Sequence, residues 1–266
     1  MAPTRTVVMG VLNVTPDSFF APSRVEATEA AVVRAQALVA QGAGIVDVGG
    51  ESTRPGATPV AEADELRRVV PVIEALRGVC RVSVDTVKPG VARAAVAAGA
   101  TLLNDVSGAL APVAAELGVG WVSMHHRGIP AAPSAAPIGP GILDEVRRVA
   151  LGGARAARDL GVSEVYVDPG IGFGKDVADN LLVLSRLDSL CDEAHAEGFG
   201  VLVGASRKRF LGALPHGRPL DPDDRFEGSL AVSVFAMACG ADVVRVHDVT
   251  ATAQASALVA QDEEAA

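Results

Sequence analysis

The chain has 266 residues, a length at which single cores usually split, although α/β barrels reach it as one domain. It is 49% hydrophobic and poor in aromatic residues, which fits a globular α/β protein and excludes a disordered one. The net charge of −9 argues against extensive nucleic-acid binding, although a local cluster of cations can still bind a small anion.

Cysteine usage and the lengths of the apolar runs indicate the compartment. Cys80, Cys191 and Cys239 lie far apart and show no metal-ligand spacing, which predicts a reducing, cytoplasmic environment. The N-terminal stretch MAPTRTVVMGVLNV is too short and too interrupted for a signal peptide. Because no apolar run reaches the length of a membrane span, we expect no membrane association.

A repeated pattern divides the chain into units from its first residues to its last. In seven places a glycine closes an alanine-rich or amphipathic segment, and a short β-branched run follows. Glycine can adopt the left-handed conformation that ends a helix, and short apolar runs suit strands buried on both faces. With the first run, the pattern predicts eight strands, at residues 7–12, 45–48, 80–84, 102–104, 121–123, 165–167, 201–203 and 243–246.

The clearest helix between two predicted strands covers residues 62–77. Asp64 can pair with Arg68 one turn later, and Pro71 should bend the helix because it removes a hydrogen bond. The apolar face is expected to consist of Leu66, Val69, Val70, Ile73 and Leu76.

Strand and helix alternate throughout, which favours a closed (β/α)8 TIM barrel that spans residues 1–266 as a single domain. An open, doubly wound sheet is the alternative, but it would more often carry a glycine-rich fingerprint after its first strand, and that fingerprint is absent. The long stretch from His125 to Gly141 is rich in proline and glycine, and we interpret it as a mobile loop over the carboxyl ends of the strands.

The stretch DPGIGFGK, residues 168–175, combines three glycines with a lysine. A Walker A loop would need glycine in place of Pro169 and Ser or Thr in place of Asp176. A dinucleotide fingerprint would need glycine in place of Lys175. Because the stretch follows an apolar run, we interpret it as a strand that ends in a carboxylate, Asp168.

Polar residues gather where the predicted strands end, which in a barrel is the active-site face. These ends carry Asn13, Glu51, Asp85, Asn104, His125, Asp168, Ser206, Arg245 and His247. The chain has 20 Arg but only three Lys, and Lys88, Lys175 and Lys208 all follow a predicted strand on this same side. This concentration is the strongest indication of a site in the sequence.

Each of these residues also has a purely structural explanation. Asp85 and Asp105 can cap helices, and Asp168 before a proline can be a turn residue. The pair His125-His126 can face solvent, and adjacent histidines make a poor metal site because their side chains diverge. A structural explanation is harder to sustain for all of them together.

The joint pattern predicts a site with two halves. Asp85, Asn104 and Asp168 offer acceptors and an amide, which suit a flat heterocycle with N–H donors. The cationic half suits phosphate or carboxylate and comprises Arg54, Lys208, Arg245 and His247.

These residues resemble the dihydropteroate synthases of folate biosynthesis, and the resemblance covers nearly the whole chain. It rests on the motifs GVLNVTPDSF (10–19), DVGGESTRPGA (47–57), VSVDT (82–86), LLNDVSG (102–108), DPGIGFGK, LVGASRKRFLG (202–212) and VRVHDV (244–249). That family joins 6-hydroxymethyl-7,8-dihydropterin diphosphate to 4-aminobenzoate and releases pyrophosphate. The resemblance therefore implies a homodimeric TIM-barrel transferase with two small-molecule substrates and Mg²⁺ as cofactor, from a family that is a target of sulfonamides.

The resemblance also implies a role for each site residue. The pterin ring would be held by Asp85, Asn104, Met124, Asp168, Phe173 and Lys208. The diphosphate would be held by Asn13, Arg245 and His247, with Asn13 as the Mg²⁺ ligand. The aminobenzoate site would consist of Phe19, Thr53, Arg54, Pro55 and Ser206. Catalysis would fall to Asn13, Lys208, Arg245 and His247.

The first loop departs from the family pattern. The family usually continues DSFSDGG, whereas this chain reads DSFFAPS and lacks the acidic residue that helps to order the site. Two alternatives therefore stay open: a pterin-binding paralogue with weak or altered activity, and a methyltransferase that passes a methyl group from methyltetrahydrofolate to a corrinoid protein. The clusters at 206–208 and 245–247 favour the synthase, because methyl transfer has no diphosphate to hold.

Overall fold

Eight parallel strands form a closed barrel in the computed structural model, which describes residues 5–15, 24–51, 58–127, 138–214 and 219–260. Each strand pairs with the next along the chain, and β8 closes the barrel on β1. The strands are β1 (Val7–Asn13), β2 (Ile45–Gly49), β3 (Arg81–Asp85), β4 (Leu102–Asp105), β5 (Gly120–Met124), β6 (Val165–Asp168), β7 (Gly200–Val203) and β8 (Val243–Val246). The predicted (β/α)8 barrel is confirmed, and every strand boundary agrees with its prediction to within one residue.

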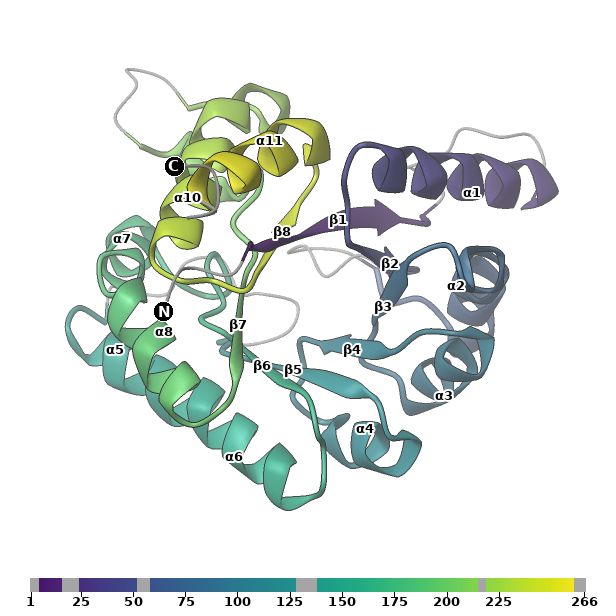
Figure 1. Cartoon of the computed structure of the whole chain (residues 1–266), viewed down its shortest axis with the longest axis horizontal. Coiled ribbons are helices and arrows are strands. Elements are labelled where there is room, and N and C mark those ends of the chain that lie inside the picture. Colours follow the sequence, from purple (N-terminus) through teal and green to yellow (C-terminus); the bar gives the residue numbers. More distant parts are fainter. Residues whose placement is uncertain (1–4, 16–23, 52–57, 128–137, 215–218, 261–266) are drawn as a thin grey trace.

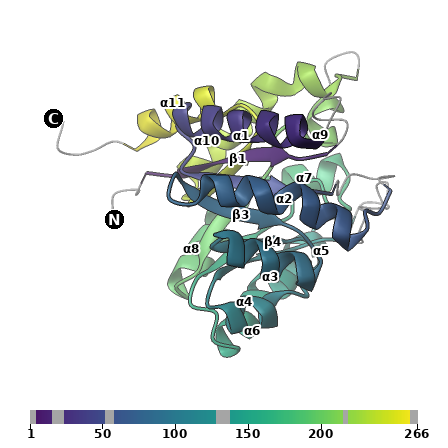
Figure 2. The ribbon, with the colours of Figure 1, turned by 90° about the vertical axis from the view of Figure 1, so that its right-hand side faces the viewer.

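Helices follow every strand and cover the outside of the barrel (Figure 1). They are α1 (Arg24–Ala40), α2 (Glu62–Leu76), α3 (Pro89–Ala98), α4 (Ala111–Leu117), α5 (Gly141–Val146), the π-helical turn η1 (Arg147–Leu151), α6 (Gly152–Asp159), α7 (Val177–Leu184), α8 (Leu187–Ala196), α9 (Arg209–Gly212), the 3-10 turn η2 (Pro222–Arg225), α10 (Phe226–Ala238) and α11 (Val249–Val259). Figure 2 shows neighbouring helices, such as α1 and α2, side by side along the barrel. Within the described ranges, none of the helices combines the length and the apolar character needed to cross a membrane.

The helix predicted at 62–77 is α2, but its pairing differs from the prediction. Glu65 is buried in it and forms an ion pair with Lys88, which precedes α3. Arg68 does not pair with Asp64; it donates to the carbonyl oxygen of Gly50 over 2.7 Å, just beyond β2. Two polar residues of α2, the buried Glu65 and Arg68, therefore anchor the loops at the carboxyl ends of β2 and β3, and helical spacing cannot predict these tertiary contacts.

Alternate residues of each strand point into the barrel and form layers. One layer is apolar and consists of Met9, Ile45, Leu102, Val122, Leu202 and Val243, with Tyr166 packed against it. The residues two positions further along the same strands face the same interior, and here they include Asp47, Asn104 and Arg245. The barrel interior thus changes from apolar in one layer to polar and charged in the next.

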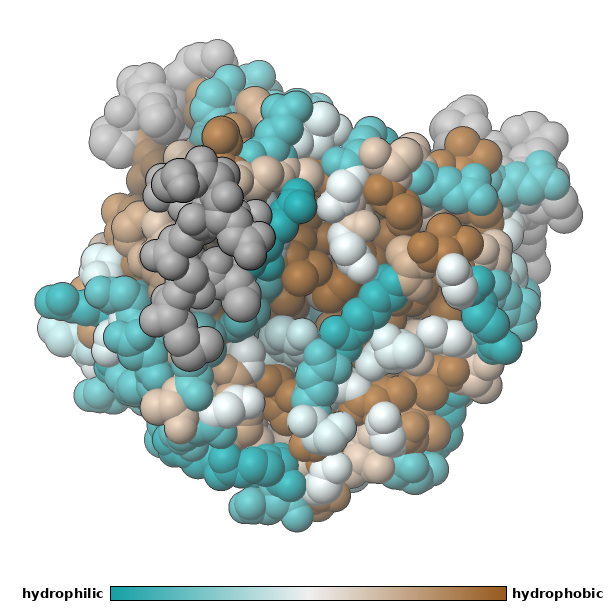
Figure 3. All heavy atoms as spheres, in the orientation of Figure 1, coloured by the Kyte–Doolittle hydropathy of each residue, from teal (hydrophilic) through white to brown (hydrophobic). Residues whose placement is uncertain are grey.

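The face of the molecule drawn in Figure 1 mixes hydrophilic and hydrophobic side chains. Hydrophilic side chains line much of the lower and left outline in this view, and hydrophobic ones are frequent toward the centre, where hydrophilic side chains lie among them (Figure 3). The loop interpreted as covering the strand ends falls mainly on residues 128–137, which lie outside the described residues, as do residues 16–23 of the first loop.

Candidate active site

An arginine between two aspartates forms the centre of the site. Arg245 in β8 donates from Nε to Oδ2 of Asp47 over 2.6 Å and from Nη2 to Oδ2 of Asp85 over 2.8 Å. Asn104, near the end of β4, donates from Nδ2 to the same oxygen of Asp47 over 2.9 Å. Four strands thus contribute to one charged network, and the predicted residues Asp85, Asn104 and Arg245 are brought together in it.

Asp47 is a site residue that the sequence reasoning missed. It lies in the middle of β2 and is fully buried, and its Oδ1 has no hydrogen-bond partner among the described residues. A buried polar atom without a partner destabilises the fold, so its retention calls for an explanation. The available signal was an acidic residue inside the run IVDVG, because a strand buried on both faces should be apolar there.

Burial makes Asp85 hard to ionise. Desolvation raises the pKa of the Asp85 carboxyl to about 7, and the negative charges of Asp47, Glu65 and Asp105 add to this effect. Arg245 acts in the opposite direction by stabilising the carboxylate. The arginine therefore decides how much of Asp85 is charged near neutral pH.

Asp168 lies at the end of β6 beside a second cation. It is buried, its Oδ1 accepts a hydrogen bond from the N–H of Gly170 over 2.7 Å, and burial raises the pKa of its carboxyl against the opposing charge of Lys208. Lys208 Nζ donates to the carbonyl oxygen of Ile171 over 2.5 Å and lies 4.0 Å from the ring centroid of Phe173, at cation–π distance. Burial lowers the pKa of Lys208 to about 7. The structure thus brings together these three predicted pterin-binding residues.

The glycines of DPGIGFGK are needed because this loop packs against other parts of the chain. Gly170, Gly172 and Gly174 all have positive φ values of 64°, 81° and 68°. A Cβ atom on Gly170 would overlap the backbone carbonyl of His125, and one on Gly172 would lie 2.6 Å from Cδ of Lys208. The glycines therefore allow the loop after β6 to contact both the end of β5 and the lysine of the site.

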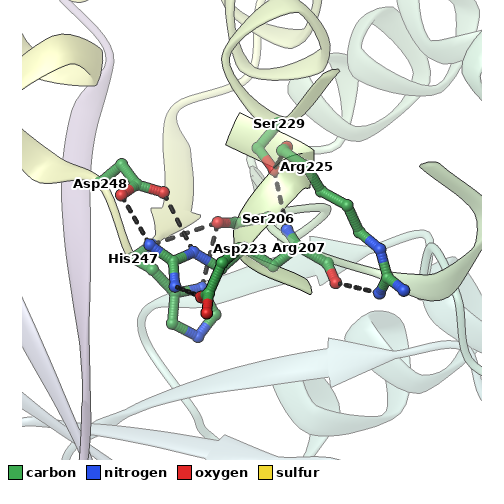
Figure 4. Close-up of polar contacts among 7 residues, drawn as sticks. All are labelled: Ser206, Arg207, Asp223, Arg225, Ser229, His247 and Asp248. Carbon is green, nitrogen blue, oxygen red and sulfur yellow. Dashed lines mark hydrogen bonds and ion pairs between the residues drawn. The ribbon is translucent and has the colours of Figure 1, made fainter. Parts of the chain in front are cut away.

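The anion-binding half is only partly as predicted. Ser206 Oγ lies 3.0 Å from Nδ1 of His247 and accepts from the N–H of the same residue over 3.2 Å, so the two predicted residues are adjacent. Arg207, in contrast, donates from Nη2 to Asp248 over 2.8 Å and from Nη1 to Asp223 over 3.1 Å, and it has a φ of 59° (Figure 4). Its charge is neutralised within the protein, which leaves Lys208 as the cation of the 206–208 cluster that faces the site.

The purely structural explanation is confirmed for Asp105. Its Oδ2 accepts from the N–H of Leu110 over 2.7 Å and from Nε1 of Trp121 over 3.4 Å, and its Oδ1 accepts from the N–H of Ser107. It therefore stabilises the turn before α4. His125, for which solvent exposure was an open alternative, is instead fully buried.

The remaining predicted residues fall into two groups. Asn13 ends β1 and is half-buried, and Met124 ends β5 and is buried, so both lie at the carboxyl ends of their strands. The aminobenzoate residues Phe19, Thr53, Arg54 and Pro55 lie outside the described residues. Among the parts of the chain that the structure describes, no group of three His, Cys, Asp or Glu side chains is placed to hold a metal ion.

Comparison with known proteins identifies the family. The pterin binding enzyme family matches residues 9–247. The chain is 45% identical to the dihydropteroate synthase of Mycobacterium leprae, over 95% of this chain and 92% of that protein. The chain belongs to the dihydropteroate synthase family. Membership makes it a transferase of folate biosynthesis that forms 7,8-dihydropteroate.

Two solved structures of this family are close in fold. The Xanthomonas albilineans dihydropteroate synthase with 4-aminobenzoic acid has a TM-score of 0.83 and 43% identity, and the alignment covers 97% of this chain and 93% of that one. The Yersinia pestis dihydropteroate synthase in complex with a sulfonamide drug has a TM-score of 0.86 and 37% identity, with coverage of 97% and 94%. The dihydropteroate synthase barrel is therefore preserved along nearly the whole chain.

Gly170→Ala should destabilise the protein by at least about 2 kcal/mol, because the new methyl group meets the carbonyl of His125 and the positive φ adds strain. Gly118→Ala is the matched control, since Gly118 also has a positive φ, of 66°, but nothing lies near its added Cβ. It should lose only about 1–2 kcal/mol. Urea unfolding of both variants measures this, and equal losses would contradict the packing argument.

Asp85→Asn should gain stability relative to the wild type as the pH rises from about 4 to 7. The raised pKa of Asp85 means that the folded state holds its proton more tightly than the unfolded chain, so ionisation on raising the pH lowers wild-type stability. The relative gain should be roughly 1–3 kcal/mol. Urea unfolding at pH 4.5 and 7.5 measures it, with the acid value as the internal reference. Parallel pH dependence in both proteins would show that Asp85 titrates normally.

Proposed function

We propose that the condensation of 6-hydroxymethyl-7,8-dihydropterin diphosphate with 4-aminobenzoate takes place at the carboxyl ends of the barrel strands. One observation carries this proposal: Asp85, Asn104 and Asp168 meet at one end of the barrel, and the cations Arg245 and Lys208 lie beside them. Carboxylates can accept from the N–H groups of a pterin, and cations oppose the negative charge of a diphosphate.

The pterin ring would lie among the carboxylates. Asp85 and Asp168 would accept hydrogen bonds from the amino and ring N–H groups, and Asn104, whose Nδ2 is engaged by Asp47, would offer its Oδ1 as an acceptor. Met124 and Phe173 would pack on the faces of the ring, and the close cation–π contact of Lys208 with Phe173 would shift to admit it.

The diphosphate would bind to Arg245 in β8 and to His247, which follows the same strand. Arg245 donates from Nε to Asp47 and from Nη2 to Asp85, and its guanidinium carries further N–H donors that would bind the diphosphate. Ser206 holds His247 in place through the two contacts described above. Asn13 would complete this half, and Ser206 would also meet the carboxylate of the aminobenzoate, together with Phe19, Thr53, Arg54 and Pro55.

Mg²⁺ fits this site only in combination with the substrate. Asn13 offers a neutral amide oxygen, and no acidic cluster for a metal exists among the described residues. Mg²⁺ commonly keeps several waters and binds few protein groups plus substrate phosphates, so one amide oxygen and the diphosphate form a suitable donor set. When bound, Mg²⁺ would stabilise negative charge on the departing pyrophosphate.

The residues of the chain would then act by stabilising charge and by positioning the substrates. The aromatic amine is a neutral nucleophile, so no strong base is needed. A C–N bond forms at the methylene carbon of the pterin, the C–O bond to the diphosphate breaks, and the amine proton leaves to solvent. Arg245 and His247 would stabilise the charge that develops on pyrophosphate, while the carboxylates hold the ring in position.

A homodimer and a cytoplasmic location complete the proposal. Phe235 in α10 is 47% exposed, and Leu258 in the adjacent helix α11 is 79% exposed. Large apolar side chains exposed on neighbouring helices favour burial against a second copy. The three cysteines are free, which agrees with a reducing compartment. Sulfonamides, one of which is bound in the Yersinia pestis relative, would compete for the aminobenzoate site.

Asp168→Asn should weaken binding of both 6-hydroxymethylpterin and its diphosphate by roughly 10- to 100-fold, because the amide replaces an acceptor with a donor. His247→Ala should spare the free pterin and weaken only the diphosphate. Isothermal titration calorimetry with the two ligands measures both effects. Equal losses for both ligands in His247→Ala would remove His247 from the diphosphate site.

Activity is tested by pyrophosphate release from the purified protein with the pterin diphosphate, Mg²⁺ and 4-aminobenzoate. Release should require the amine, with dihydropteroate as the product. Tight pterin binding without amine-dependent release would contradict the proposed reaction and would identify the altered first loop as the first region to restore.

Phe235→Glu should convert the protein to a monomer, because it places a charge in the proposed interface. Val79→Glu is the matched control, since Val79 is 50% exposed and follows α2 on another part of the barrel. Light scattering after size-exclusion chromatography measures the mass of each. A wild-type monomer, or a dimer that survives Phe235→Glu, would contradict the proposal.

A further inference from the structure

A buried lysine lies behind the proposed pterin carboxylate. Lys175 is 6% exposed, and its Nζ donates to the carbonyl oxygen of Gly170 over 2.7 Å and lies 2.6 Å from Nδ1 of His125. Removing an ammonium group from water is costly unless partners compensate. None of the steps proposed above uses this lysine, so its burial calls for a separate explanation.

In the hydrogen bonds around Lys175, the lysine donates to His125, and His125 donates in turn to a carboxylate. A protonated lysine can only donate, so Nδ1 of His125 accepts and the ring proton lies on Nε2. Nε2 lies 3.2 Å from Oε1 of Glu145 in α5, a carboxylate that accepts. Burial, together with the positive charge of Lys175, lowers the pKa of His125 to about 4, so the ring stays neutral. His125 thus joins the ammonium to a carboxylate that is partly exposed.

Gly170 connects Lys175 to Asp168. The N–H of Gly170 donates to Oδ1 of Asp168, and its carbonyl oxygen accepts from Lys175, each over 2.7 Å. The ammonium also stabilises the ionised form of Asp168 through space. One lysine therefore acts on both the position and the charge of the carboxylate.

Charged groups from several elements face Lys175. Burial lowers the pKa of Lys175 to about 7, and the like charge of Lys208, before α9, lowers it further. Asp168 at the end of β6, Glu145 in α5 and Asp179 in α7 act in the opposite direction. The carboxylate that the ammonium stabilises, Asp168, therefore stabilises the ammonium in turn.

We propose that Lys175 is a positioning residue for the pterin: its buried ammonium, oriented by His125, holds the turn after β6 and keeps Asp168 ionised. This inference rests on the proposed role of Asp168 in binding the pterin N–H groups. Loss of the lysine charge raises the pKa of Asp168. Because pterin binding requires the ionised carboxylate, acidification should then abolish binding at a higher pH than in the wild type.

Lys175→Met should weaken binding of 6-hydroxymethylpterin about tenfold at pH 6 and move the acid limb of its pH profile up by about one unit. Calorimetric titrations from pH 5 to 9 measure this. Asn180→Ala is the matched control, because Asn180 holds the same turn by an uncharged hydrogen bond, accepting from the N–H of Gly172 over 2.6 Å. It should weaken binding by the same factor at every pH. A Lys175→Met profile that is unchanged, or that is weakened by one factor at every pH as in Asn180→Ala, overturns the proposal.

A second measurement does not depend on the folding of Lys175→Met. The chain has only three lysines, so isotope-labelled lysine gives three side-chain NMR signals, assigned with Lys88→Met and Lys208→Met. Asp168→Asn should lower the pKa of Lys175 by about one unit. An unchanged Lys175 titration overturns the inference. A wild type that binds no pterin would instead remove the proposed function itself, so the two failures are distinguishable.

Discussion

Arg245 binds two buried carboxylates inside the barrel, and the rest of the site depends on this pairing. Asp47 and Asp85 come from neighbouring strands and would repel each other in an interior where water cannot screen them. The arginine reaches them from β8, on the other side of β1. Because β8 closes the barrel on β1, Arg245 can reach and neutralise the two carboxylates only when the sheet is closed. A single arginine thus joins the stability of the barrel to the chemistry at its end.

The two halves of the site follow from this distribution of charge. Asp85 and Asp168 have raised pKa values because burial disfavours their charge, and Lys208 beside them has a lowered pKa for the same reason. Asp85 and Lys208 both titrate near neutrality, so a substrate that supplies N–H donors and negative phosphate can change the protonation of the site as it binds. The charges of the protein groups compensate one another only in part, and a ligand with N–H donors and negative phosphate would complete the compensation.

Packing of the main chain also positions Asp168 and Lys208. The loop after β6 turns at three glycines, runs against the carbonyl of His125 and contacts the stem of Lys208. A side chain at Gly170 would separate β5 from β6 at the point where Met124 and Asp168 are paired in register. Asn180 and Asp176 then hold the loop to the start of α7. The glycines that first resembled a phosphate loop thus serve the protein's own packing.

The sequence by itself determined the architecture and most of the polar residues of the site. Short β-branched runs and glycine helix ends are local signals, and eight of them fix the number and order of strands, while polar strand ends mark the catalytic face. The sequence could not decide which polar residues meet, because Asp47 and Arg245 are far apart in the chain and only barrel closure joins them. The opposite roles of Asp85 and Asp105, the turn of Arg207 toward Asp248 and the burial of His125 against Lys175 were likewise decided by tertiary structure. In each case the physical reason is desolvation. A charged side chain that is removed from water needs a partner, and the tertiary fold, not the spacing in the sequence, determines which partner lies beside it.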